Sequence, residues 1–426
     1  MQPENSILTQ ALSKATWRLL PFLFLCYFFA YLDRVNVGFA KLQMASDLGL
    51  SDVVYGLGAG VFFIGYFLFE VPSNLILHRV GARRWIARIM ISWGAISACM
   101  LFVKSPSSFY ILRFLLGVAE AGFFPGVILY LTYWFPAKTR GRITALFMAA
   151  IPVSGIIGGP LSGWILDFFS GVGGMAGWQW LFLIEGVPTV LIGFSVLWVL
   201  SDRIVDVSWL SAEEKSVLQQ ALDAEQSEKE SHSFGEALRN AKVWVLSLIY
   251  FCIQMGVYAI SFWLPTLLTA SGLSSSTKVG LVSAVPYIAA ALTMLVIGYS
   301  ADRRRERRWH LIIPIAMAFV GLSGAAYFPP EHLISLACLT LATMGYFTAL
   351  PMFWPLPSAF LGGMAAAGGL AMINSFGNLA GFVSPYMVGW IRDQTGSASN
   401  ALYILAGIAV LGAVLILTIP AKAVNR

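Results

Sequence analysis

The chain has 426 residues, of which 58% are hydrophobic and only 11% charged, and its mean hydropathy is +0.76. This composition excludes a soluble globular domain and predicts an integral membrane protein. A formal net charge of +6 would suggest a nucleic-acid partner in a soluble protein, so the positions of the basic residues decide what the charge means.

Apolar runs recur along almost the whole sequence and are long enough to cross a bilayer as helices. A spanning helix needs about 20 mainly apolar residues. A β-barrel would instead show short alternating segments, so we predict an all-α fold. The first 20 residues lack the features of a cleaved signal peptide, so the first run is expected to remain a helix. The twelve predicted spans are 17–39, 53–77, 85–103, 107–135, 142–168, 179–200, 243–270, 279–300, 310–329, 333–358, 363–391 and 400–421.

The basic residues are distributed unevenly between the two sides of the membrane. Twelve spans place both termini on one side, and all but six of the 27 Lys and Arg residues belong to that side. The positive-inside rule therefore predicts cytoplasmic termini in a cell (inner) membrane, with no need for nucleic acid. The six others are Lys41, Lys104, Lys278 and Arg392 on the opposite side, and Arg34 and Arg113 within spans.

Four charges fall inside the first and fourth spans, at Asp33, Arg34, Arg113 and Glu120. Each costs about 2.5–3.5 kcal/mol at the centre of a membrane helix, so all four are expected to face protein or water. Arg113 and Glu120 lie seven residues apart on one helix face. Tyr31 and Arg34 likewise share a face, whereas Asp33 points about 100° away from its neighbour.

Intramembrane ionisable groups usually mark an ion or substrate pathway. We therefore expect Arg34 to meet a substrate carboxylate, Asp33 to pair with Arg113, and Asp33 and Glu120 to carry the coupled protons. The alternative is a structural salt-bridge network that holds the helices together. Buried ion pairs are weak evidence for that alternative, because desolvation can exceed the Coulomb gain.

One long polar stretch, residues 201–242, separates six spans from six. It predicts a cytoplasmic linker between an N-terminal bundle, 1–200, and a C-terminal bundle, 243–426. Within it, Ser211 and Glu214 have the spacing of a capping box and predict a short surface helix.

The two halves repeat each other. "HRVGARRW" after the second span matches "DRRRERRW" after the eighth, and "GWILD" at 163–167 matches "GWIRD" at 389–393. The offsets are 224 and 226 residues, which indicates an internal duplication. Parallel six-span repeats with a site between them at the bilayer midplane are a transporter architecture.

The stretches "NLILHRVGARR" and "GYSADRRRERR" resemble the loop signature G-x-x-x-D-R-x-G-R-R of the major facilitator superfamily. The first copy departs from it at Asn74 and His78. The resemblance implies a latch on the cytoplasmic side, and we expect Glu70 to contact a loop arginine there. The residues assigned to gating are Glu70, Arg79, Arg83, Asp302 and Arg303.

The stretches "YLDRVNVGFA", "FFIGYFLFEVPSNL" and "RFLLGVAEAGFFPGVI" resemble the anion:cation symporter branch of that superfamily. The resemblance implies import of organic anions such as tartrate, sugar acids or aromatic carboxylates with protons. It also implies that the charges of the first and fourth spans, Tyr66 and Asn374 face the pathway. The fifth span lacks a glutamine that several sugar-acid carriers have, which favours smaller or more apolar acids.

The second half has no charge inside its six apolar runs, which predicts that it shapes the substrate pocket. Its candidates are Tyr258, Trp354 and Asn374. No nucleotide-binding loop, metal-ligand cluster or nucleophile-base arrangement is present in the sequence, so we expect neither an enzyme nor a cofactor. The four cysteines lie within spans without ligand spacing. We expect a monomeric proton-coupled carrier, with an anion exchanger or a transporter-like sensor as alternatives.

Overall fold

The computed structural model describes residues 3–226, 240–360 and 365–420, and this part of the chain contains helices and no strand. The helices of the first half are α1 (Pro3–Val35), α2 (Val37–Leu48), α3 (Asp52–Val80), α4 (Ala82–Cys99), α5 (Pro106–Glu120), α6 (Phe123–Thr132), α7 (Ala137–Met148), α8 (Ala150–Phe168) and α9 (Gly177–Val199). A linker helix, α10 (Ala212–Gln226), follows. The second half contains α12 (Ala241–Thr269), α13 (Ser276–Arg304), α14 (Arg308–Tyr327), α15 (Leu333–Phe353), α16 (Pro355–Phe360), α17 (Ala365–Asn378), α18 (Ala380–Thr395) and α19 (Ser399–Leu417).

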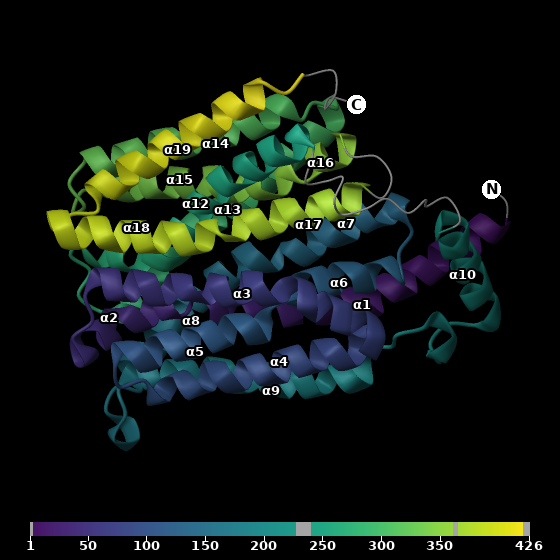
Figure 1. The fold of residues 1–426 in the computed structure, drawn as a ribbon, viewed down its shortest axis with the longest axis horizontal. Helices are drawn as coiled ribbons and strands as arrows, with labels where there is room; N and C mark the ends of the chain where they lie inside the picture. The colour runs from purple at the N-terminus through teal and green to yellow at the C-terminus, as the bar shows by residue number, and fades with distance from the viewer. Residues whose placement is uncertain (1–2, 227–239, 361–364, 421–426) are drawn as a thin grey trace.

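The predicted all-α membrane architecture is confirmed. Eleven helical segments of the described chain are long and apolar enough to cross a membrane. The remaining predicted span, 363–391, corresponds to α17 and α18, which lie end to end and are interrupted at Leu379 (Figure 1). Its first two residues lie outside the described part of the chain. The first span is longer than predicted, because α1 and α2 continue one another from Ser6 to Leu48.

The helices form two bundles that lie side by side. Figure 1 shows the purple and blue helices of the first half below the green and yellow helices of the second, with both chain ends at the right. The bundles meet mainly where α8 packs on α13, α3 on α18 and α2 on α12. We refer to the end with both termini as the predicted inner end and to the opposite one, at α2, as the predicted outer end.

The fourth predicted span is interrupted directly after Glu120, and this break determines how deep the Glu120 carboxylate lies. α5 ends at Glu120 and α6 begins at Phe123, with Gly122 between them at a φ of +86°. A side chain is disfavoured at this positive φ, and a Cβ on Gly122 would lie 2.3 Å from the Ser73 hydroxyl oxygen. Glycine therefore permits both the turn and the close contact with α3, and Glu120 lies at a helix end inside the protein.

The linker helix confirms the predicted capping box. The Glu214 backbone N–H donates to the Ser211 hydroxyl at 3.2 Å, and the Ser211 N–H donates to the Glu214 carboxylate at 2.8 Å. Glu214 also binds the Lys14 ammonium at 2.7 Å, which fastens α10 to α1. This ion pair holds the pKa of the Glu214 carboxyl below its ordinary value.

Candidate substrate site between the bundles

A central cavity with an empty volume of about 440 Å³ lies between the two bundles. α1, α3, α6, α7 and α8 line it from the first half, and α12, α15 and α17 from the second. Arg34 is the one charged residue in its described lining. The polar lining residues are Tyr27, Tyr31, Arg34, Tyr66, Tyr250, Gln254, Tyr258, Asn374 and Asn378.

Arg34 forms a buried ion pair with Glu120 at the wall of this cavity. Its Nε donates to Glu120 Oε1 at 3.0 Å, and its Nη2 contacts the same oxygen. Arg34 is 7% exposed, and its guanidinium carbon lies 5.7 Å from the ring centres of both Tyr31 and Tyr66. Aromatic faces attract a cation at this distance. The Phe62 ring centre lies 5.6 Å from the same carbon, so the cationic group is held by one carboxylate and three rings while it faces the cavity.

Asp33 points away from the cavity, as the helical geometry predicts, but its predicted pairing with Arg113 is wrong. Its carboxylate accepts hydrogen bonds from Ser97 at 3.1 Å and Thr189 at 2.7 Å. The physical reason is the position of the helices, because Asp33 faces α4 and α9 while α5 carries Arg113 against α3.

Arg113 is fully buried behind the cavity wall. It donates to the backbone carbonyls of Gly58 and Ala59 at 3.3 and 3.2 Å, and its guanidinium carbon lies 5.1 Å from the Phe62 ring centre. The cavity lining does not include it. The partners of Arg113 are therefore backbone carbonyls and not the Asp33 carboxylate that the sequence predicted.

Glu70 joins the two bundles, but its predicted arginine partner is wrong. Its carboxylate accepts a hydrogen bond from the Asn374 amide and another from the Ser375 hydroxyl, each at 2.9 Å. Asn374 lines the cavity, so this contact lies at the boundary of the candidate site. An acidic residue of α3 is therefore bound by neutral donors of α17.

The second half contributes neutral polar groups, and sequence reasoning missed two of them. Tyr258 donates to Asn378 at 3.0 Å, and Gln254 donates to Tyr250 at 3.3 Å. Gln254 and Tyr250 were not predicted, although their spacing of four residues on one face of α12 also includes Tyr258. Trp354 was predicted to contact substrate, but it packs behind the lining, 5.0 Å from the Tyr250 ring centre.

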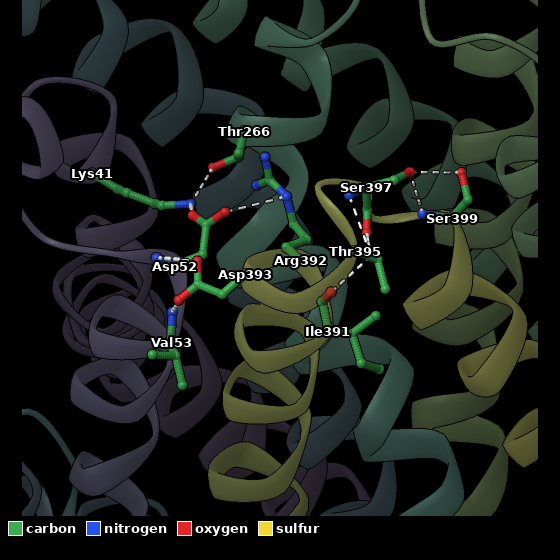
Figure 2. A network of polar contacts seen from close by, with 10 residues as sticks. All are labelled: Lys41, Asp52, Val53, Thr266, Ile391, Arg392, Asp393, Thr395, Ser397 and Ser399. Carbon is green, nitrogen blue, oxygen red and sulfur yellow. Dashed lines mark hydrogen bonds and ion pairs between the residues drawn. The ribbon is translucent and has the colours of Figure 1, made fainter.

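At the predicted outer end, polar contacts join the two bundles at two places, α18 with α3 and α8 with α13, which we call the outer seams. Figure 2 shows Asp393 at the end of α18 pointing at the start of α3, where it accepts from the Asp52 and Val53 backbone N–H groups at 3.0 and 2.8 Å. Lys41 and Arg392 bind the Asp52 carboxylate beside them. Carboxylates are stabilised at helix N-termini, so Asp393 caps a helix of the opposite half.

The second outer seam repeats this arrangement. Asp167 at the end of α8 accepts from the Ser276 and Thr277 backbone N–H groups at 3.2 and 2.7 Å, at the start of α13. Asp167 and Asp393 are the final residues of "GWILD" and "GWIRD". The repeated pentapeptide of the sequence thus marks equivalent contacts between the bundles.

The predicted gating residues of the loops contact their own half or the linker. Asp302 pairs with Arg307 at 2.5 Å, and the Arg83 backbone N–H donates to Asp202 at 2.8 Å. The side chains of Arg79 and Arg303 are exposed. In the residues the structure describes, these four positions make no polar contact across the bundle interface.

Comparisons with known proteins agree with this architecture. A family model described as Major Facilitator Superfamily matches residues 23–385. A Pseudomonas putida protein provisionally named metabolite transport protein NicT is 51% identical, across 98% of this chain and 96% of that protein. An Agrobacterium vitis protein provisionally named tartrate transporter is 49% identical, across 97% of this chain and 92% of that protein.

A solved structure of a D-xylose-proton symporter superposes with a TM-score of 0.75 at 16% sequence identity. The alignment covers 96% of this chain and 99% of that one, and at this identity it shows the fold alone. The matched family consists of transporters rather than enzymes, and the family match covers most of the chain. The chain therefore belongs to the major facilitator superfamily of membrane transporters.

Proposed function

We propose that the chain imports a small organic carboxylate together with protons by alternating access. The observation that carries this proposal is the Arg34–Glu120 pair, because Arg34 is the one charged residue in the described lining of the central cavity. An anion that enters the cavity meets this guanidinium between two aromatic rings. Tyr258, Asn374 and the neighbouring neutral groups would bind the rest of the molecule.

Competition between Glu120 and the substrate for Arg34 couples anion binding to protonation. A substrate carboxylate and Glu120 both bind the same guanidinium, and a protonated Glu120 releases it to the substrate. Asp33 is the second proposed proton carrier. Loss of protons at the inner side restores the Arg34–Glu120 pair and expels the anion. Arg113 and Trp354 support the site from behind its lining.

The names of the relatives support the substrate class. NicT is named for metabolite transport and the Agrobacterium vitis protein for tartrate, which is a small dicarboxylate. We therefore propose uptake across the cell (inner) membrane by a monomer with cytoplasmic termini. Residues 1–200 and 243–426 form its two moving bundles, and residues 201–242 form the linker. Glu70 with Asn374, together with the loop residues of the predicted latch, controls the inner side.

The test is uptake of labelled tartrate, an aldonate, phthalate or a hydroxyphenyl acid into liposomes, with and without an inward proton gradient. We expect the gradient to drive accumulation of at least one acid. Glu120→Gln should abolish this accumulation while exchange of internal for external anion continues. If the unmodified protein exchanges anions at a rate that does not depend on the gradient, it is an antiporter. If it binds the anion without transporting it, it is a sensor.

A further inference from the structure

A second cavity lies beside the central one, and the proposed substrate path does not use it. It has an empty volume of about 350 Å³ and is lined by α1, α2, α8, α12 and α13. Tyr31 lines the central cavity and Ser261 the second one, and their hydroxyls are hydrogen-bonded at 3.1 Å. This contact separates the two cavities.

A buried carboxylate, Glu185, is bound to the wall of the second cavity, and a second one, Asp33, lies behind it. Glu185 is 1% exposed and accepts a hydrogen bond from Ser162 at 2.8 Å, and Ser162 lines the cavity. Thr189, one turn after Glu185 on α9, donates to Asp33 at 2.7 Å. Polar groups therefore lead from the cavity through Ser162 to Glu185, and Thr189 on the next turn of α9 binds Asp33.

Neither carboxylate has a cation partner among the described residues, whereas Glu120 has Arg34. The charged groups that act on Asp33 are Glu185 from α9 and Glu120 from α5, while α4 and α8 supply the hydroxyls of Ser97 and Ser162. Two ionised carboxylates in this apolar environment would repel each other and lose their hydration. One proton shared by the pair removes the repulsion and one of the two desolvation costs.

Two buried polar groups beside the second cavity, the Glu185 carboxylate and the Asn36 amide, indicate where a proton enters. Glu185 Oε2 is buried and makes no hydrogen bond of regular geometry in the described structure, although the Asn36 amide lies within reach of this carboxyl group. The Asn36 side-chain amide lines the cavity, lies beside Glu185, and lacks hydrogen-bond geometry to any described group. Buried polar atoms without regular hydrogen bonds are rare and costly, so Glu185 Oε2 is suited to receive a proton and the Asn36 amide to bind water.

We infer that Glu185 and Asp33 form a proton-binding site that loads from the second cavity rather than from the substrate cavity. A hydronium ion in the second cavity gives its proton to Glu185 Oε2 and leaves water. The proton then passes to Asp33, past Thr189. This inference rests on the proposed function, because it names the route by which coupled protons reach Asp33.

A substrate-independent experiment tests the site. Infrared difference spectroscopy of the full-length protein in liposomes records the carboxyl C=O band as the pH is stepped. We expect Glu185→Gln to remove one titrating carboxyl band. Ser162→Ala should raise the midpoint of that band by about one pH unit, because it deletes one hydrogen bond to the ionised carboxylate.

Ser154→Ala is the matched control, since Ser154 is a buried serine of the same helix and cavity whose hydroxyl donates to the Ile151 carbonyl. It should leave the band unchanged. An unaltered band in Glu185→Gln, or equal shifts in the two serine variants, would overturn the inference. A band that responds to sodium ions instead of pH would overturn it as well, in favour of a metal-cation site.

Transport measurements separate this inference from the proposed function. If the proton gradient drives uptake equally in the unmodified protein and in Glu185→Gln, the inference fails and proton-coupled import stands. If the carboxyl band behaves as expected but no gradient drives uptake of any tested acid, proton-coupled import fails and the proton site stands. Thermal unfolding of each variant identifies any that misfold, and Ser162→Ala then provides the deciding result.

Discussion

The two bundles are alike where they meet at the predicted outer end and different where they face the central cavity. Every buried Asp, Glu, Lys and Arg in the described bundle helices belongs to the first half, and these residues are Asp33, Arg34, Lys41, Glu70, Arg113, Glu120 and Glu185. The second half lines the cavity with neutral groups such as Gln254, Tyr258 and Asn378.

The two halves of the predicted duplication thus share their contacts with each other but differ in their buried charges. Asp167 and Asp393 cap equivalent helices of the opposite half. The charges in the first bundle have no counterparts in the second. Contacts between the two bundles depend on shape and backbone, whereas the proposed binding of an anion and protons needs charge on only one side.

The largest effect is expected when the Arg34–Glu120 ion pair of the first half is removed. Arg34→Gln leaves Glu120 buried without its cation, which should lower the free energy of unfolding by about 3–5 kcal/mol and abolish anion binding. Glu120→Gln should also destabilise the protein, and the double variant should recover much of the loss. Chemical unfolding in detergent measures all three as a double-mutant cycle. Additive single effects would show that the pair is not coupled.

The next effect tests the similarity of the outer seams. A Cβ on Gly163 would lie 2.3 Å from the Ser276 carbonyl oxygen, and a Cβ on Gly389 would lie 2.2 Å from that of Asp52. Alanine at either position should therefore push the bundles apart and cost about 1–3 kcal/mol in unfolding free energy.

Gly407→Ala on α19 is the control for this pair, because nothing lies within 4 Å of the added Cβ. It should leave the unfolding free energy unchanged or slightly higher. Equal losses at Gly163 and Gly389 would support equivalent seams, whereas a loss at one of them alone would contradict the equivalence.

A smaller effect is expected in the neutral half. Asn378→Ala removes the acceptor of the Tyr258 hydroxyl and should weaken apparent affinity for the transported acid by up to about tenfold, the effect of one hydrogen bond. The dependence of transport on pH should stay the same, because no ionisable group is lost. Uptake kinetics at several pH values measure both quantities. A changed pH profile would place proton coupling in the second half too.

The smallest effect concerns the linker helix, outside both bundles. Lys14 lowers the pKa of Glu214 in the folded protein from its ordinary 4.5, so the pair stabilises docking of α10 above that pH. The contribution is lost as the pH falls below 4.5 and Glu214 is protonated. The protection factors of the α10 amides, which correct for the intrinsic dependence of exchange on pH, should fall over this range. In Glu214→Gln the exchange should already be fast at neutral pH, whereas Glu213→Gln should behave like the unmodified protein.

Much of the fold follows from the sequence because membrane helices have a simple signal. Long apolar runs must satisfy their backbone within one helix, so their number, order and class can be read directly. Helical geometry also fixes which side chains of one helix share a face. It correctly placed Tyr31 and Arg34 towards the cavity and Asp33 away from it.

Contacts between helices were decided only by the tertiary structure. The sequence indicated that Asp33 and Glu70 need partners but not which helices supply them, and both predicted arginine partners were wrong. Glu185 likewise gave no sign that it lies beside Asp33, since the two residues are far apart in the chain. Periodicity determines the direction of a side chain around its own helix, whereas the packing of the bundles determines what lies in that direction.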